Sequence, residues 1–198
     1  MDRETGFTLV ELLVTIVVVS ILLAMGAPAF KDFIKNNRVT AQTNDLVSAI
    51  QLARSEALKR GTNMVVCASK GGGKCTGKDT WTDGWIVFSD FDPTDGPDPD
   101  VGSGKCKDAE DCIMTTGTGL SQGSTLTTTA KSLCFLPTSL SGTAPSASTE
   151  HCTTVSSAVS SVEFILKAAD CQKNQARKVT VTKQGHTLVS PCTSCACS

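Results

Sequence analysis

An apolar segment near the start of the sequence constrains the fold more than any other feature. Residues 7–30 number 24 and include one ionisable side chain, Glu11. As one helix they would extend for roughly 36 Å, which exceeds the roughly 30 Å hydrocarbon core of a bilayer. A carboxylate within lipid costs about 2.5–3.5 kcal/mol and usually has a partner. The segment holds no basic residue, so we expect the partner of Glu11 to come from another molecule.

The helical pattern continues beyond this segment. Between Lys31 and Arg60, apolar residues recur mostly three or four apart, which predicts one apolar stripe. Pro28 predicts a kink, and Gly61 predicts the end of the helix. We therefore expect one helix from about Phe7 to Arg60, apolar on all sides over 7–30 and lying on a globular domain over 31–60. The predicted stripe consists of Phe33, Ile34, Leu46, Val47, Ile50, Ala53, Ala57 and Leu58.

The remaining residues, 61–198, predict a β-rich domain. Alternating apolar and polar residues indicate strands, and Gln184-Gly185 indicates a hairpin turn before the last of them. The expected fold class is α+β, with the long helix packed on one or two antiparallel sheets. Residues 115–161 are rich in Ser, Thr and Gly, so we expect them to bury little core. The predicted strands are 63–67, 84–88, 162–166, 178–183 and 187–189.

Ten cysteines follow the apolar segment, and their number and scatter favour disulfides formed outside the cytosol. The sequence does not determine their pairing. Short loops favour three of the pairs, and the remaining cysteines, at 171, 192, 195 and 197, receive no predicted partner. The three predicted pairs are Cys67–Cys75, Cys106–Cys112 and Cys134–Cys152.

A short motif at the start of the apolar segment connects the chain to a known family. Gly6 is followed directly by Phe7, and Glu11 lies four residues after Phe7. This pattern resembles the processing site and first helical turn of type IV pilins and pseudopilins. Residues 44–57 and 84–88 resemble the minor-pilin and minor-pseudopilin branch, the FimT/FimU and GspH-like group. The resemblance covers roughly residues 6–88.

The resemblance implies a processing history and a role for Glu11. A prepilin peptidase would remove the leader, residues 1–6, by cutting between Gly6 and Phe7, and would methylate the new amine of Phe7. In the family, the glutamate at the position of Glu11 faces the N-terminal amine of a neighbouring subunit. The alternative is that Glu11 merely extends to the membrane surface. We favour the pairing interpretation because Gly6 and Phe7 occupy the matching positions.

The implied function is that of a minor type IV pilin, a structural subunit without enzymatic activity. It would cross the inner membrane once, with a periplasmic domain, and then join other minor and major pilins in a surface pilus. There it would support assembly at the tip, adhesion, twitching motility or DNA uptake. A minor pseudopilin of a type II secretion system is the main alternative. A secreted enzyme released after Ala29 is a further one, although two histidines and no tyrosine leave few acid–base groups.

An acidic stretch after the second predicted strand raises the question of a calcium site. Asp90, Asp92 and Asp95 are spaced two or three residues apart near Gly96, as in a calcium-binding loop. The EF-hand pattern is not met, because no glutamate stands at the closing position. An acidic, proline-rich turn in solvent is the alternative. We expect no other cofactor.

DNA binding is a third hypothesis, and it concerns the last strands. The net charge of the whole chain is −1, so bulk charge does not indicate a nucleic-acid partner. However, the chain has no acidic residue after Cys171, and Lys178 and Lys183 are the first and last residues of a predicted strand. Some related pilins bind DNA through a G-R-x-R element near the last hairpin, whereas this chain has Gly185-His186-Thr187-Leu188 there, with neither arginine.

Overall fold

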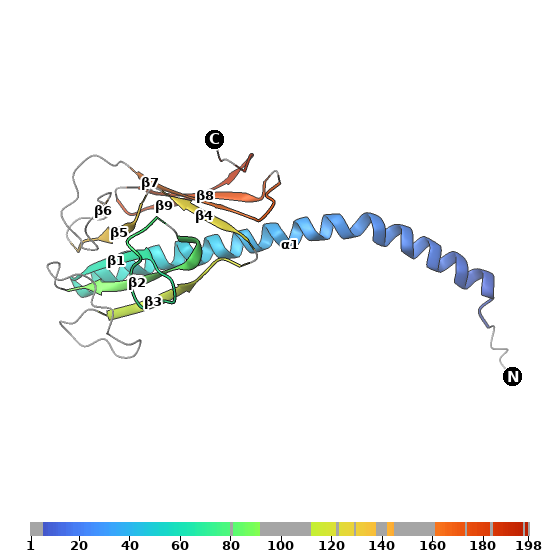
Figure 1. Cartoon of the computed structure of the whole chain (residues 1–198), viewed down its shortest axis with the longest axis horizontal. Coiled ribbons are helices and arrows are strands. Elements are labelled where there is room, and N and C mark those ends of the chain that lie inside the picture. Colours follow the sequence, from blue (N-terminus) through green and yellow to red (C-terminus); the bar gives the residue numbers. More distant parts are fainter. Residues whose placement is uncertain are drawn as a thin grey trace.

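One long helix projects from a domain made of two antiparallel sheets in the computed structural model (Figure 1). The helix, α1 (Leu9–Arg60), contains 52 residues and matches the single helix predicted from the sequence. The described residues are 6–79, 81–91, 112–121, 123–128, 130–137, 142–144, 161–172, 174–182, 184–195 and 197.

Both ends of α1 are capped. The hydroxyl of Thr8 accepts a hydrogen bond from the backbone N–H of Glu11 at 3.2 Å. At the other end Gly61 has φ 67°, a left-handed conformation that favours glycine, and its N–H donates to Ala57 O at 3.0 Å. The helix continues through Pro28, and Figure 1 shows that it curves over its N-terminal half.

In the described residues nine strands form the two sheets, and every neighbouring pair is antiparallel. The α+β class with a helix packed on antiparallel sheets is therefore confirmed. The five-stranded sheet has the order β3 (Cys112–Thr118), β2 (Gly84–Asp90), β1 (Asn63–Ala68), β5 (Ser132–Phe135), β6 (Gly142–Ala144). The four-stranded sheet has the order β4 (Thr125–Thr128), β7 (Ser161–Lys167), β8 (Ala176–Thr182), β9 (Thr187–Cys192).

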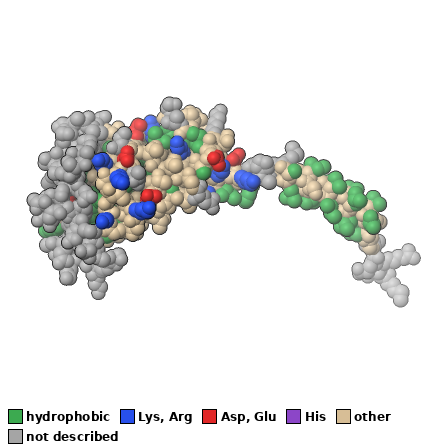
Figure 2. Space-filling model, viewed as in Figure 1, with side chains coloured by type: hydrophobic (Ala, Val, Ile, Leu, Met, Phe, Trp, Pro, Cys, Tyr) green, Lys and Arg blue, Asp and Glu red, His purple; other side chains and the backbone are tan. Residues whose placement is uncertain are grey.

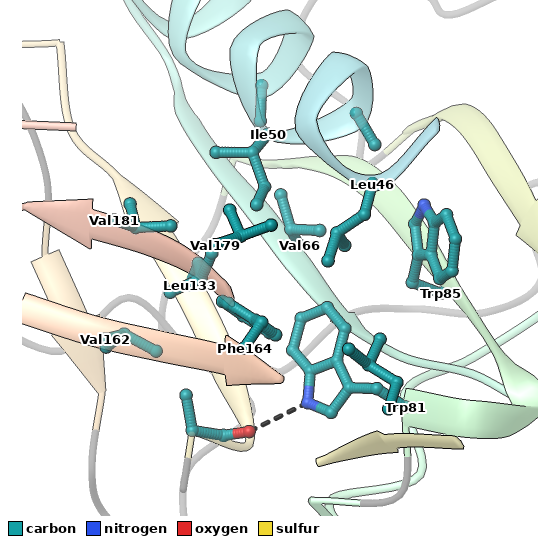
Figure 3. Packing of buried hydrophobic residues seen from close by; sticks show 14 of the residues in the cluster. Leu46, Ile50, Val66, Trp81, Trp85, Leu133, Val162, Phe164, Val179 and Val181 are labelled. Carbon is teal, nitrogen blue, oxygen red and sulfur yellow. Dashed lines mark hydrogen bonds between the residues drawn. The ribbon is translucent and has the colours of Figure 1, made fainter. Parts of the chain in front are cut away.

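The core lies where the C-terminal half of α1 meets both sheets (Figure 3). Leu46 and Ile50 of α1 are fully buried there, together with Phe164 of β7. Trp81, in the short 3-10 helix η1 (Trp81–Asp83), packs edge-to-face against Phe164 with ring centroids 5.0 Å apart. Its indole N–H donates to Ala130 O at 2.8 Å, so this fully buried ring leaves no polar atom unsatisfied.

The predicted apolar stripe of α1 is correct in its middle and wrong at its ends. Phe33, Ile34 and Leu58 are 61%, 40% and 51% exposed, and the buried face begins at Val39. Helical periodicity shows which residues share a face, but it does not show how far along that face the domain extends.

The expectation that residues 115–161 bury little core is wrong for the described part of that region. Leu126 of β4 and Leu133 and Phe135 of β5 are at most 2% exposed. Threonine is β-branched and favours strands, so a Thr-rich stretch pairs well at a sheet edge and supplies a few apolar side chains to the core. The Ser-, Thr- and Gly-rich composition of this region did not indicate these short strands.

Disulfides join the loops to the sheets. The predicted Cys67–Cys75 bond is present, and the structure also pairs Cys171 with Cys195 and Cys192 with Cys197. Cys112 and Cys134 are disulfide-bonded as well. The partners predicted for them, Cys106 and Cys152, lie outside the described residues.

Candidate assembly site

The residues predicted for processing and assembly lie at the free end of α1. Gly6 and Phe7 precede the helix, Glu11 lies in its first turn, and Figure 1 shows this end far from the domain. Phe7 is 75% exposed, and among the described residues nothing beyond the chain neighbours of Gly6 lies within 4 Å of the place where a Cβ on it would stand. The bond between Gly6 and Phe7 is thus open to a protease.

Glu11 also lies where its charge stabilises the start of the helix, a role that we did not predict from the sequence. Thr8 is the N-cap, so Glu11 occupies the third helical position, the spacing of a capping box. A carboxylate in the first turn is also stabilised by the positive end of the helix dipole. The signal was present in the sequence as a threonine three residues before a glutamate. Among the described residues, no cation forms an ion pair with Glu11.

The first turns of α1 expose apolar side chains on all sides of the helix, and Figure 2 shows one face of them. The large apolar residues between Leu9 and Leu23 are each 49–79% exposed. Across the part of the chain that the structure describes, no helix combines the length and hydropathy needed to cross a bilayer. A surface of this kind favours contact with other apolar groups.

Two side chains at the start of β8, Gln175 just before the strand and Arg177 within it, contact α1 where it leaves the domain, and we call them the clamp. The amide of Gln175, which is 4% exposed, donates to Asp32 Oδ1 at 3.1 Å. Arg177 Nη2 donates to Asn36 Oδ1 at 2.6 Å and to Thr40 Oγ1 at 3.4 Å. The clamp fixes the direction in which the helix projects.

A groove of about 500 Å³ lies between α1 and the edge strand β3. Gly117 forms part of its wall beside Trp85 and Leu52. A Cβ on Gly117 would lie 2.1 Å from Trp85 Cε2, so glycine is required where the strand crosses the indole ring. The groove also contains hydroxyl groups and one carboxylate, from Asp45. No pattern in the sequence predicted this groove.

The predicted calcium and DNA residues are only partly described. Asp90 is buried at the end of β2, whereas Asp92 and Asp95 lie outside the described residues. Within the described ranges, no group of three or more His, Cys, Asp or Glu side chains could hold a metal ion. Lys178 Nζ lies 3.2 Å from Glu163 Oε1, so a carboxylate offsets its charge, and Lys183 lies outside the described residues.

Comparison with known protein families adds support that is independent of the geometry. A family model described as type II transport protein GspH matches residues 42–185, which hold the C-terminal part of α1 and most of the β-rich domain. The chain belongs to the GspH family. A second model, the prokaryotic N-terminal methylation motif, matches residues 1–27, which include Gly6, Phe7 and Glu11.

The curated relatives include fimbrial proteins and a prepilin peptidase-dependent protein. One fimbrial protein from Pseudomonas aeruginosa is 32% identical over 96 residues, covering 48% of this chain and 56% of the relative. A fimbrial protein of Moraxella nonliquefaciens is 30% identical over 91 residues, covering 45% and 51%. Prepilin peptidase-dependent protein D of Escherichia coli K12 is 36% identical over 59 residues, covering 28% and 40%. The chain spans about half the length of the first of these relatives.

A solved structure shares the fold. The crystal structure of the Pseudomonas aeruginosa type IV minor pilin FimU aligns with a TM-score of 0.50 and 14% identity. The alignment covers 82% of this chain and 98% of FimU. The pilin fold is thereby confirmed for this GspH-family chain.

Proposed function

We propose that this GspH-family chain is a minor type IV pilin, a structural subunit that enters the pilus at or near its tip. It acts by packing and ion pairing and carries out no reaction of its own. The observation that supports this most strongly is the free apolar helix of α1, which carries Gly6, Phe7 and Glu11 at its end. The pilus would then serve adhesion, twitching motility or DNA uptake.

Processing is the first step of the proposal. A prepilin peptidase cuts between Gly6 and Phe7, removes residues 1–6 and methylates the amine of Phe7. That amine then lies one residue before the N-cap Thr8 and four residues before Glu11. The match of the N-terminal methylation motif to residues 1–27 supports this step.

Residence in the inner membrane is the second step. Residues 7–30 cross the bilayer once, residues 31–60 lead into the domain, and residues 61–198 lie in the periplasm. The disulfides support an exported domain, because such bonds persist in oxidising compartments. The subunit then leaves the membrane and becomes part of a pilus at the cell surface.

Pairing of Glu11 is the third step. A carboxylate without a cation is costly in an apolar environment. Docking beside another pilin supplies that pilin's N-terminal amine in surroundings of low dielectric constant, where the attraction is much stronger than in water. The ion pair favours the assembled state and fixes the axial position of the subunit.

Replacing Glu11 by alanine tests this step. We expect Glu11→Ala to be processed normally at Phe7 and to be absent from sheared pili, measured by intact mass and by immunoblot of the pilus fraction. Thr8→Ala is the matched control, because it removes the cap that the N–H of Glu11 uses but keeps the carboxylate. Incorporation of Glu11→Ala at the parent level, or equal loss with Thr8→Ala, would contradict pairing.

A type II secretion pseudopilin is the second candidate, and the GspH family match favours it. Both machines use the same helix, so the discriminating measurement is partner capture. We expect site-specific cross-linking through the exposed side chain of Val14 to capture pilus subunits. Capture of secretion-system pseudopilins alone would assign the chain to secretion.

A further inference from the structure

The stretch of α1 between the apolar segment and the domain, residues 30–39, forms a neck with three distinct faces. Successive residues of a helix are rotated by about 100°, so residues three or four apart share a face. One face is held by the domain, since Asp32 and Asn36 accept hydrogen bonds from the clamp and Val39 is fully buried. The second face points away from the domain, and the third lies beside the first, with Lys31 exposed and Lys35 and Arg38 half-buried.

The second face of the neck is apolar and exposed. Phe30, Phe33 and Ile34 have the spacing i, i+3, i+4 and are 63%, 61% and 40% exposed. Large apolar side chains on one face of a helix insert at the boundary between the headgroups and the acyl chains. This face continues the apolar segment toward the domain.

The third face of the neck is basic. Lys31, Lys35 and Arg38 lie four and three residues apart, and none of them forms an ion pair with any described residue. Figure 2 shows basic, acidic and hydrophobic side chains together where the helix leaves the domain. The neck contains one acidic residue, Asp32, which points to the clamp. Its outward charge is therefore positive.

The position of the neck places these two faces at the membrane surface, and this step rests on the proposed function. The headgroup layer adds about 5–8 Å on each side of a roughly 30 Å hydrocarbon core. Phe33 lies roughly 4.5 Å and Arg38 roughly 12 Å beyond Phe30 along the helix axis. Long basic side chains extend back toward the lipid surface, so all three cations come within reach of lipid phosphates.

We propose that the neck binds the headgroups of anionic phospholipids while the subunit waits in the membrane. Phe30, Phe33 and Ile34 insert at the interface, and the basic face contacts lipid phosphates. Charge complementarity supports this contact, since a cluster of basic residues beside a membrane helix attracts anionic lipid. Lysine and arginine are usually concentrated on the cytoplasmic side of a membrane helix, so a basic cluster on the exported side calls for a function of its own.

A tryptophan introduced in place of Phe33 can report this contact. Trp81 and Trp85 are 0% and 3% exposed, so they give a constant background that the parent chain measures. The full-length F33W chain is reconstituted into vesicles whose lipids are brominated near the glycerol group. The vesicles contain either phosphatidylcholine alone or phosphatidylcholine with phosphatidylglycerol. We expect quenching of the introduced indole to be about twofold greater with phosphatidylglycerol and to lose that excess at high salt.

Neutralising the basic face tests the charge dependence. In the F33W background, the triple variant K31Q/K35Q/R38Q is expected to lose the excess quenching. The matched control K59Q/K70Q/K78Q removes the same charge from side chains on the far part of α1 and the domain, and it should keep the excess. Equal quenching in both kinds of vesicle, or the same loss in both triple variants, would overturn the proposal.

Two further measurements distinguish headgroup contact from failed insertion and from self-association. Flotation of the chain with vesicles measures membrane insertion, so a chain that fails to float contradicts the proposed membrane stage itself. A floating chain with quenching independent of lipid charge contradicts only the headgroup contact. If quenching falls as the protein-to-lipid ratio rises, a second subunit covers the neck instead of lipid, and the proposal is wrong.

Discussion

At the scale of single residues, Glu11 shows what a sequence can and cannot indicate. Its isolation in an apolar segment predicted a partner outside the chain, and no cation pairs with it in the described part of the structure. Its place three residues after the N-cap Thr8 also puts its charge near the positive end of the helix dipole, which stabilises the helix start. The two roles are compatible, because the backbone N–H of Glu11 donates to the Thr8 hydroxyl and the carboxylate remains available for an ion pair with another subunit.

Gly117 offers a test of packing at one residue. A methyl group there would overlap the ring of Trp85, so Gly117→Ala must displace either β3 or the indole. We expect a loss of about 1–3 kcal/mol in the free energy of unfolding. Thermal unfolding of the full chain in detergent measures it. Gly73→Ala is the control, since that position has open space, and equal stability of the two variants would contradict this packing.

Glu56 offers a test of pH dependence. The hydrogen bond from Arg60, at 2.5 Å, lowers the pKa of Glu56, and Lys59 adds to the effect. A lowered pKa means that the charged form stabilises the folded state above the ordinary glutamate pKa of about 4.3, and that this stabilisation is lost as the pH falls through the lowered value.

The Glu56→Gln variant should therefore be less stable than the parent by about 0.3–1 kcal/mol at neutral pH. The difference should shrink as the pH falls below the glutamate range, as measured by denaturant unfolding from neutral to acidic pH. A difference that stays constant with pH would show that the charge of Glu56 is not the cause.

At the scale of elements, the helix was predictable and the short strands were not. The boundaries of α1 follow from local chemistry, with Thr8 as the N-cap and Gly61 as the left-handed C-cap. The strands β4 and β5 have four residues each, and they lie in a region rich in Ser, Thr and Gly that resembles a loop in composition. They are strands because β7 and β1 supply hydrogen-bonding partners from distant parts of the chain. Such pairing depends on the tertiary fold, which local composition does not encode.

The clamp is the element-level feature that no pattern predicted, because Arg177 and Asn36 lie 141 residues apart. We expect Arg177→Ala to raise the rate of amide hydrogen exchange in residues 31–41 of α1 by about tenfold, since it removes the donor to Asn36 and Thr40. Mass spectrometry of peptides from the full chain measures this. Lys59→Ala, at an exposed position, should leave exchange in 31–41 unchanged. Unchanged exchange in Arg177→Ala would show that the clamp does not hold the helix.

At the scale of the whole molecule, the chain divides into a closed domain and an open helix. The C-terminal half of α1 completes the core beneath both sheets, whereas the N-terminal half exposes apolar side chains on all sides. This division suits a subunit that buries its helix against other molecules. Hydropathy along the sequence predicted this division. It placed the start of the domain-packed part of the helix at residue 31, but Phe33 and Ile34 are still exposed.

The pairing of the tail cysteines also belongs to this scale. Cys195 bonds to Cys171, which precedes the clamp, and Cys197 bonds to Cys192 at the end of β9. The first bond joins the C-terminal tail to the loop before the clamp, and the second closes the tail onto the end of β9. Sequence spacing alone favoured only bonds across short loops, and Cys171–Cys195 joins residues 24 apart. Proximity in the fold decides this pairing.

The mass of the mature N-terminus tests the proposed pilin function most directly. The protein is purified from cells that express the full chain with its processing machinery, and the N-terminal peptide is sequenced by mass spectrometry. We predict that the chain begins at Phe7 with one methyl group on its amine. A chain that begins at Phe30, after cleavage behind Ala29, would contradict the pilin function, because it would lack both Glu11 and the helix through which the subunit assembles.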